Sequence, residues 1–394
     1  MKKVAAFITA FVLFFGIIVA LHLAVTDNVS VKNKDFGTWV SVYKDLSYTS
    51  ISENISRDSM LVFGSSEFNH GKRTLYHPAN LFKNKKADIM IIGKAYNQSL
   101  SHAISLGAVE GKLQNRKVIL ILSPTWFYKE GVIAKNYAIR FSEGNYMALM
   151  ENKDISKDVK RRIGQRTIEL LKSDDMMRSR VKRYNRMYLD DKGSYIDRML
   201  YGIRKKYLRD KELLTVNTAF KLEKLKETTQ QKKNPEYGVL DWKALSKKAV
   251  ESEIKGRTNP YGMSDRFFHS KFKKRLVYAE NYHAKASFEK SPEYDDLKCF
   301  LDICRQTDIK SMLVIQPLNG HWYDYTGLTE EKRRVFNDNI KKIASEYDAE
   351  VTDLSYMEYS KYYFEDAVHP ARRGWVTINE EIYRFYNEDN NSNR

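Results

Sequence analysis

Two short segments near opposite ends of the chain carry the residue types that nucleophilic catalysis needs. The first reads Phe63-Gly64-Ser65-Ser66-Glu67-Phe68, and the second reads Asp366-Ala367-Val368-His369-Pro370. A serine hydroxyl becomes a nucleophile when a base takes its proton, and a histidine base needs a carboxylate that orients its ring. The two segments together supply all three groups.

Each segment alone also fits a simpler structural role. Gly64 permits a tight turn, after which a serine can stand exposed at a sheet edge. The same residues would also fit a turn glycine followed by a serine that caps a helix, with the Glu67 side chain bonding back to the cap in the first turn. Asp366 and His369 are three residues apart, so one short loop can present both. An aspartate three residues before a histidine is also common in surface loops that have no catalytic role.

Five short apolar runs predict the strands that would position these segments. Each run is bounded by turn residues, as is typical of buried parallel strands with helices on both faces. Amphipathic segments at 99–113, 293–306 and 330–347 lie between the runs, which indicates an α/β doubly wound fold with a mainly parallel five-stranded sheet. The runs are Met60–Phe63, Ile89–Ile92, Val118–Leu122, Met312–Ile315 and, more weakly, Glu350–Leu354.

The loops at the carboxyl ends of such strands are where active residues collect. Gly64–Glu67 follows the first predicted strand, and Asp366–His369 lies between the last strand and a helix that begins near Arg372. We therefore expect both segments at one edge of the sheet.

The region from about residue 131 to 291 is charged and poor in apolar runs, with helical patterns at 155–171 and 176–189. We interpret it as a mostly helical insertion within a catalytic domain at 56–394. Because the predicted strands before and after it belong to one sheet, the insertion must leave and rejoin the core. Much of the surplus positive charge falls here, for example at Arg178–Arg183.

An uncharged apolar run at Val4–Val25 is long enough, at about 1.5 Å per residue, to span the hydrocarbon core of a bilayer. A cleaved signal peptide has a shorter core followed by small residues. The run therefore predicts a retained transmembrane anchor within residues 1–26, followed by a juxtamembrane segment at 27–55. Lys2 and Lys3 precede it, which predicts a cytoplasmic N-terminus and a domain outside the cell.

The net charge of +17 favours either a polyanionic neighbour or simple solubility. No compact run of basic and aromatic residues indicates a nucleic-acid platform.

Cys299 and Cys304 are too far apart along a predicted helix to bridge comfortably, so we expect buried packing cysteines. Apart from Asp366 and His369, no histidine pairs with Cys, Asp or Glu at a recognised zinc spacing, and we expect no metal or cofactor.

In combination, the two segments resemble the first and last sequence blocks of SGNH (GDSL-like) hydrolases. The third residue of that superfamily's Gly-Asp-Ser pattern is its nucleophile, which corresponds to Ser66, with Ser65 in place of the aspartate. Two further segments, Gln316–Gly327 and Ser123–Phe127, narrow the resemblance to the DltD family. The four ordered motifs and the anchor cover essentially the whole chain.

The resemblance implies an SGNH-type sheet and a function in D-alanylation. DltD proteins are membrane-anchored and put D-alanine onto teichoic acids in Gram-positive bacteria. D-alanine would form an ester on Ser66 and pass to a hydroxyl of lipoteichoic acid, while His369 acts as base and then acid and Asp366 orients it. The implied partners are lipoteichoic acid, the acyltransferase DltB and other membrane proteins of the pathway, and indirectly the carrier protein DltC.

An acyl-transfer site also needs donors for the developing oxyanion. Backbone N–H groups at Ser66 and near Gly93 are candidates. SGNH hydrolases add an asparagine after the third strand, where this chain has Ser123-Pro124-Thr125. Asn97, after the second strand, could serve instead, or it could cap the following helix.

Other residues predicted at the site lie in loops at its edge, where aromatic rings could line a substrate groove or simply pack. Two alternative functions remain: an SGNH-type esterase or thioesterase acting on an acyl carrier, and a non-catalytic membrane scaffold that binds polyanions. The cytoplasmic location of an acyl carrier argues against the thioesterase. The predicted oxyanion and substrate-binding residues are Gly93, Asn97, Thr125, Trp126, Asn319, Trp322 and Tyr323.

Overall fold

One five-stranded parallel sheet forms the centre of the domain. The computed structural model describes residues 2–83, 87–223, 225 and 240–388. The strand order is β2-β1-β3-β4-β5, and every pairing is parallel. The predicted α/β fold and its five strands are confirmed. The strands are β1 Met60–Phe63, β2 Ile89–Ile92, β3 Lys117–Leu122, β4 Lys310–Ile315 and β5 Glu350–Asp353.

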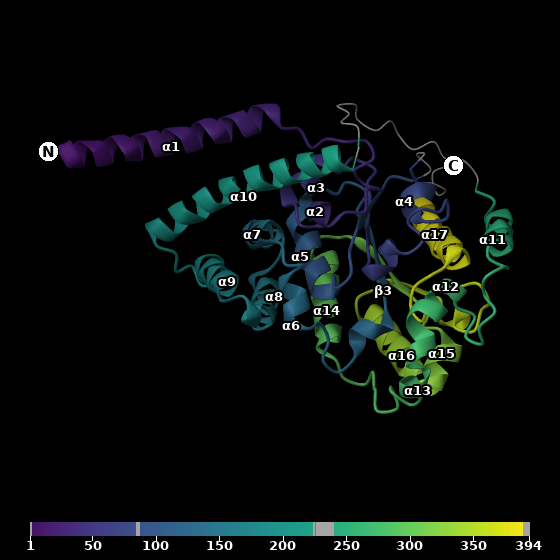
Figure 1. The fold of residues 1–394 in the computed structure, drawn as a ribbon. Helices are drawn as coiled ribbons and strands as arrows, with labels where there is room; N and C mark the ends of the chain where they lie inside the picture. The colour runs from purple at the N-terminus through teal and green to yellow at the C-terminus, as the bar shows by residue number, and fades with distance from the viewer. Residues whose placement is uncertain (1, 84–86, 224, 226–239, 389–394) are drawn as a thin grey trace.

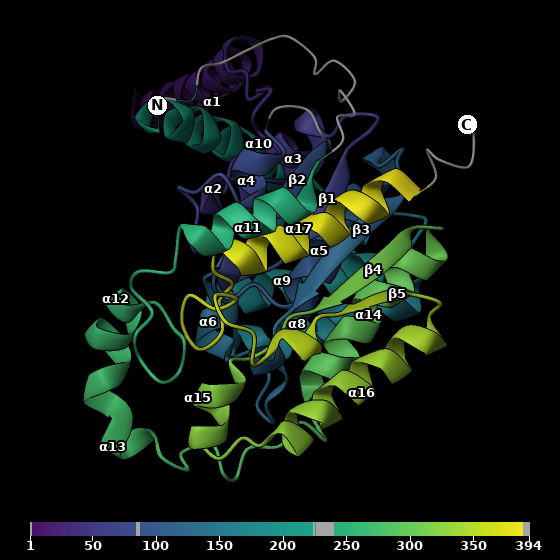
Figure 2. The ribbon, with the colours of Figure 1, turned by 90° about the vertical axis from the view of Figure 1, so that its right-hand side faces the viewer.

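Helices cover both faces of the sheet, and every residue of β1, β2 and β3 is buried, as in doubly wound folds. On one face, Leu61 and Phe63 pack against α5 (Ser99–Val109), α14 (Pro292–Gln306) and α16 (Glu330–Glu346). On the other face, Met60 and Val62 pack against α4 (Pro78–Leu81) and α17 (Arg372–Asn387). Figure 2 views the molecule from the α17 side.

The strand order reverses at β1. The chain passes from β1 to β2 on one side and then crosses to β3 on the other side of β1. Such a switch point opens a crevice at the carboxyl ends of the strands, which is where ligands bind in open parallel sheets. The segment that follows β1 begins at Gly64 and leads directly into the Ser66 turn.

The region predicted as an insertion is mostly helical in its described parts, and its helices lie in two places. Helices α6 to α10 lie beside α5 and α14, whereas α11, α12 and α13 lie on the other side, near α17 and α15 (Gly320–Tyr325) (Figure 1). Residues 224 and 226–239 of this region, and 389–394 of the predicted domain, lie outside the described residues. The helices are α6 Ala134–Ala138, α7 Glu143–Glu151, α8 Lys157–Leu170, α9 Asp175–Tyr188, α10 Tyr195–Leu222, α11 Trp242–Glu251, α12 Asp265–Phe267 and α13 Leu276–Ala279.

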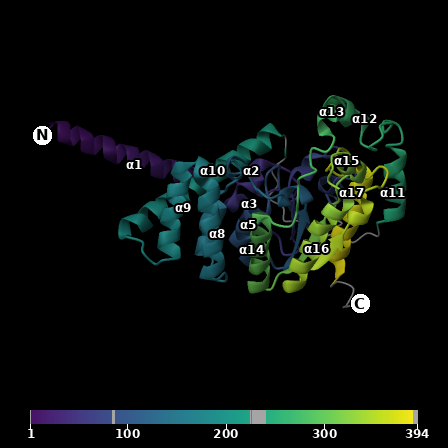
Figure 3. The ribbon, with the colours of Figure 1, turned by 90° about the horizontal axis from the view of Figure 1, so that it is seen from below.

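The apolar N-terminal run forms one long helix, α1 (Lys2–Asn28), that projects from the domain (Figure 3). In the described residues it is the one helix long and apolar enough to cross a membrane. Its side chains are exposed except near its C-terminal end, where Val25 is buried. This exposure is what a helix that meets lipid rather than protein requires, so α1 is a candidate membrane anchor. The chain then forms α2 (Val42–Asp45) and α3 (Tyr48–Asn54) before β1.

Both cysteines lie on α14 as free, buried thiols. Burial raises the pKa of the Cys299 thiol to about 12. The expectation of packing cysteines without a disulfide is confirmed.

Candidate active site

Ser66 and His369 meet at the carboxyl edge of the sheet although 303 residues separate them in sequence. The Oγ of Ser66 lies 2.8 Å from Nε2 of His369. On the other side of the ring, Nδ1 lies 2.9 Å from Oδ2 of Asp366. Because an ionised carboxylate only accepts, Nδ1 carries the proton and Nε2 is left to accept the serine hydroxyl. This is the geometry of a serine activated by a general base.

The serine turn is held by two glycines and a buried carboxylate. Ser66 starts a 3₁₀ turn, Ser66–Asn69, and Glu67 Oε1 accepts the Ser65 N–H at 2.5 Å. A Cβ on Gly64 would lie 2.2 Å from that same Oε1. A Cβ on Gly93, whose φ is +151°, would lie 1.9 Å from the Gly64 carbonyl oxygen. The loops after β1 and β2 therefore pack in direct backbone contact, which only glycine allows.

The histidine loop is closed by its own hydrogen bonds. Oδ1 of Asp366 accepts the N–H groups of Val368 and His369, each at 2.9 Å. Glu365 N–H donates to the His369 carbonyl at 2.8 Å. Gln316, directly after β4, donates from Nε2 to the Val368 carbonyl at 2.6 Å. The end of β4 thus fixes the position of the histidine loop.

The local electrostatics keep Asp366 ionised and His369 basic. Burial alone would raise the pKa of Asp366, but the hydrogen bond and charge of His369 hold that pKa well below its usual range. Burial opposes a charge on His369, yet the hydrogen bond and charge of Asp366 raise its pKa above the usual 6.5, with further help from Glu67 and Glu365. Burial also raises the pKa of Glu67 itself.

A second histidine, His70, lies against the first. Its ring is parallel to that of His369, with the centroids 3.7 Å apart and the planes 5° apart. Its Nδ1 lies 3.0 Å from Oε2 of Glu365. Sequence reasoning missed this pair. The signal was present, because His70 follows Ser66 by four residues and Glu365 directly precedes Asp366.

His70, Asp366 and His369 also present ligand atoms within 4.8 Å of one another. However, Nδ1 of each imidazole already faces a carboxylate, and Nε2 of His369 faces Ser66. A cation bound between them would have to displace these hydrogen bonds. The donor set therefore suits proton transfer better than metal binding.

The predicted oxyanion donors differ in what they contact. The Ser66 N–H donates to no described residue. The Gly93 N–H faces the carboxyl of Asp45 and helps to lower the pKa of that group, although burial as the largest effect still raises it to about 6. Asn97 accepts the Lys94 N–H at 3.2 Å and does not cap α5, whose N-cap is Gln98. No described residue accepts from its Nδ2, so among the predicted donors the Ser66 N–H and Asn97 Nδ2 are the two without a described acceptor.

The remaining predicted residues pack in the core or make local hydrogen bonds. Trp126, Trp322 and Tyr323 are all buried and pack among other rings. Asn319 caps α15 by accepting the Trp322 N–H at 3.1 Å, and it donates to the Tyr261 carbonyl at 2.9 Å. The Oγ1 of Thr125 lies 2.9 Å from the Ser123 hydroxyl. Of the two roles that the sequence left open for the rings, packing is the one that the structure shows.

Two hollows lie beside the start of the histidine loop, one lined by Glu365 and the other by Phe364. One, of about 230 Å³, includes Glu365 itself and is rich in cationic side chains. The other, of about 290 Å³, is lined by Asn319, His321 and several tyrosines. The cations of the first hollow are Lys255, Arg257, Arg266 and Arg372.

Comparison with known proteins identifies the family of this fold and site. Residues 34–387 match the family described as DltD protein. The chain belongs to the DltD family. The match includes Ser66, Asp366 and His369, and it begins after α1.

Three proteins named Protein DltD are similar over most of their length. The relative from Staphylococcus aureus is 28% identical over 337 residues, which cover 82% of this chain and 79% of the relative. The Bacillus subtilis relative is 26% identical over 333 residues, with 82% and 81% covered. The Lacticaseibacillus rhamnosus relative is 23% identical over 354 residues, with 84% and 78% covered.

Proposed function

We propose that this DltD-family chain transfers D-alanine to lipoteichoic acid through an ester on Ser66. The observation that carries the proposal is the 2.8 Å contact between Ser66 Oγ and Nε2 of His369, backed by Asp366. Family membership supports the D-alanyl substrate, and the serine geometry supports covalent acyl transfer. The domain would act outside the cell, with Lys2 and Lys3 of α1 in the cytoplasm.

In the first half-reaction, Ser66 Oγ attacks the carbonyl carbon of a D-alanyl donor while its proton moves to Nε2 of His369. The oxyanion that forms would be stabilised by the Ser66 N–H and Asn97 Nδ2. When the intermediate collapses, the bond to the donor's leaving group breaks and that group takes the proton from His369. D-alanine is left as an ester on Ser66.

In the second half-reaction, a hydroxyl of the polymer gives its proton to His369 and attacks the ester carbonyl. The bond to Ser66 Oγ breaks, and the serine takes the proton back. Asp366 stabilises the imidazolium that exists in both halves, which fits the raised pKa of His369.

The cationic hollow beside Glu365 supports a polyanionic acceptor. Arg257 and Arg372 face Glu253, at 3.0 and 3.8 Å. Within the described part of the chain, Lys255 and Arg266 have no carboxylate partner. A phosphodiester polymer could bind there electrostatically close to His369. DltB and other membrane proteins of the pathway are the proposed partners, with DltC acting upstream.

The two alternatives differ from the transferase in measurable ways. An esterase or thioesterase would use the same residues but pass the acyl group to water, so its product would be free D-alanine. A non-catalytic scaffold would not need Ser66 Oγ within hydrogen-bond reach of His369. The observed contact therefore favours an enzyme over a scaffold.

Cells that lack their own copy and express Ser66→Ala, His369→Ala or the unchanged full chain would test the proposal. We expect near-complete loss of D-alanine esters from lipoteichoic acid in both variants at equal protein levels. Ser345→Ala, an exposed serine on α16, is the matched control and should load normally. Normal loading by Ser66→Ala would disprove the serine mechanism.

A further inference from the structure

The helix α10 (Tyr195–Leu222) has two faces with opposite surroundings. One face is buried in the domain and includes Tyr201, Leu208 and Val216. The other face is apolar but exposed, with relative exposures of 43% to 62%. The residues of this exposed stripe are Ile196, Met199, Leu200, Ile203, Tyr207 and Leu214.

The exposed stripe runs along one side of the helix from Ile196 to Leu214. At about 100° per residue its members fall within a sector about 100° wide. Asp210 lies within the same sector. Its carboxylate Oδ2 lies 2.7 Å from Nδ1 of His22 on α1. The stripe therefore shares the face of α10 that contacts the candidate membrane anchor.

A second contact ties α10 to the point where the chain leaves α1. Nδ2 of Asn217 donates to the Ser30 carbonyl at 3.1 Å. Ser30 follows the last residue of α1, Asn28, by two residues, which span at most about 7 Å. If α1 crosses a bilayer, the segment of α10 from Asp210 to Asn217 must lie at the membrane surface.

We propose that the exposed stripe of α10 lies against the lipid leaflet next to the domain. Lys206 and Lys211 flank the stripe on its two sides, where their ammonium groups can reach anionic phosphates while their stems lie along the apolar surface. Tyr195, 83% exposed, stands at the start of the helix. An aromatic ring with a polar tip is favoured at the membrane–water interface.

The neighbouring helix limits how deep α10 can lie. α9 (Asp175–Tyr188) packs beside the N-terminal half of α10 and carries Arg178, Arg180, Lys182, Arg183 and Arg186. These charges cannot enter the hydrocarbon core. α10 runs alongside α1 (Figure 1), so its N-terminal half enters the leaflet only as far as these cations can still reach the head groups.

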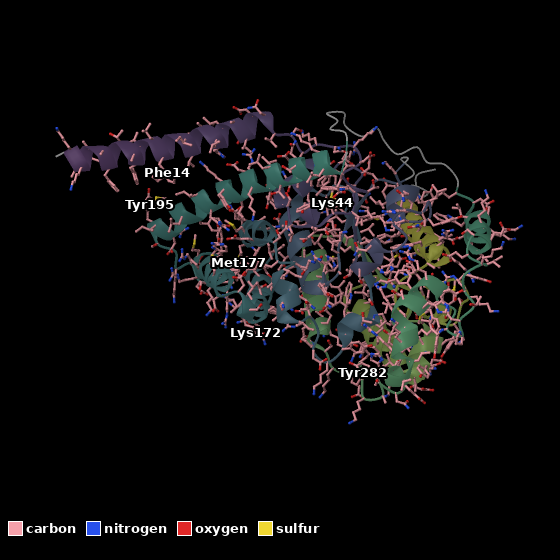
Figure 4. The ribbon with its side chains drawn as sticks, in the orientation of Figure 1. Phe14, Lys44, Lys172, Met177, Tyr195 and Tyr282 are labelled. Atoms are coloured by element: carbon pink, nitrogen blue, oxygen red, sulfur yellow. The ribbon has the colours of Figure 1, made fainter. Side chains whose placement is uncertain are left out.

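Three labelled side chains show where α10 lies relative to α1. Phe14 on α1 and Tyr195 on α10 lie on one side of the molecule, whereas Tyr282 lies far from both (Figure 4). Tyr282 is also exposed, at 75%, and so provides a control position remote from the proposed lipid contact.

Depth-dependent fluorescence quenching of the full chain in lipid nanodiscs would test this placement. A cysteine-reactive environment-sensitive dye is attached to Ile203→Cys, in the stripe, to Arg209→Cys, exposed on another side of α10, or to Tyr282→Cys. Cys299 and Cys304 are buried and remain unlabelled. The quenchers are lipids with a nitroxide on the acyl chain and, separately, aqueous iodide.

We expect the dye at residue 203 to be quenched several-fold more by the nitroxide lipid than the dyes at 209 and 282, and less by iodide. Equal lipid quenching at all three positions would overturn the proposal. Protection of residue 203 from both quenchers would also overturn it, because the stripe would then contact a second copy of the chain. The result does not depend on Ser66 chemistry, since Ser66→Ala should give the same quenching pattern.

Discussion

The imidazole rings of His70 and His369 are stacked face to face, with centroids 3.7 Å apart and planes 5° apart. One face of the base is therefore covered by a ring that has its own carboxylate partner, Glu365. Since Asp366 fixes the edge of the His369 ring and His70 covers its face, the base has little freedom to tilt away from Ser66.

Removing the covering ring should slow transfer without abolishing it. We predict that His70→Ala lowers kcat about 10- to 100-fold, because a small misplacement of a catalytic group has effects of this order. His70→Phe preserves the flat surface and should retain most of the activity. The measurement is D-alanyl transfer by the full chain in proteoliposomes. Equal losses in both variants would show that His70 acts through its charge or hydrogen bond instead.

The pH dependence should follow His369. Its raised pKa means that the neutral base is lost at a higher pH than for a free histidine, so activity should fall as pH drops through a midpoint above 6.5. Asp366→Asn removes the main group that raises this pKa. We predict that the midpoint moves to lower pH while the maximal rate falls by up to about 10⁴-fold. A pH profile of transfer checks both, and an unchanged midpoint would contradict the assignment.

Close packing of the two loops makes Gly93 irreplaceable. Gly93→Ala would place a Cβ 1.9 Å from the Gly64 carbonyl oxygen at a φ of +151°, and we predict a loss of at least about 2 kcal/mol in the free energy of unfolding. Gly202→Ala on α10, where nothing lies within 4 Å of the added Cβ, is the matched control. It should be neutral or stabilising by up to about 1 kcal/mol. Chemical denaturation of the detergent-solubilised chain would measure both.

Charge reversal in the hollow beside Glu365 should affect the acceptor step alone. We predict that Lys255→Glu with Arg266→Glu raises the KM for lipoteichoic acid and weakens the salt dependence of transfer, while ester formation on Ser66 continues. The matched control is Lys112→Glu with Lys342→Glu, two exposed lysines near the starts of β3 and β5. If both pairs change KM equally, only the total charge matters.

The sheet and the two candidate catalytic segments were predictable because their signals are local. A buried parallel strand is a short apolar run, and all five runs became strands within one or two residues of the predicted bounds. The Ser66 and His369 segments are fixed to strand ends, and parallel strands bring their carboxyl ends to one edge.

Other features depend on contacts between distant segments, which no local pattern reveals. The stacking of His70 on His369 requires two loops 299 residues apart to meet (369 minus 70). The direction of the Gly93 N–H depends on Asp45, from the juxtamembrane segment. The apolar face of α10 is visible in its sequence, but its position beside α1 is not.

If D-alanine passes through Ser66, its ester on that serine should be detectable. Membranes that contain the full chain and its pathway partners would be supplied with an activated, isotope-labelled D-alanyl donor without polymer acceptor, quenched in acid and analysed by peptide mass spectrometry. We predict label on the Ser66 peptide, absent in Ser66→Ala and lost when lipoteichoic acid is added. Transfer to the polymer at the normal rate by Ser66→Ala would contradict it.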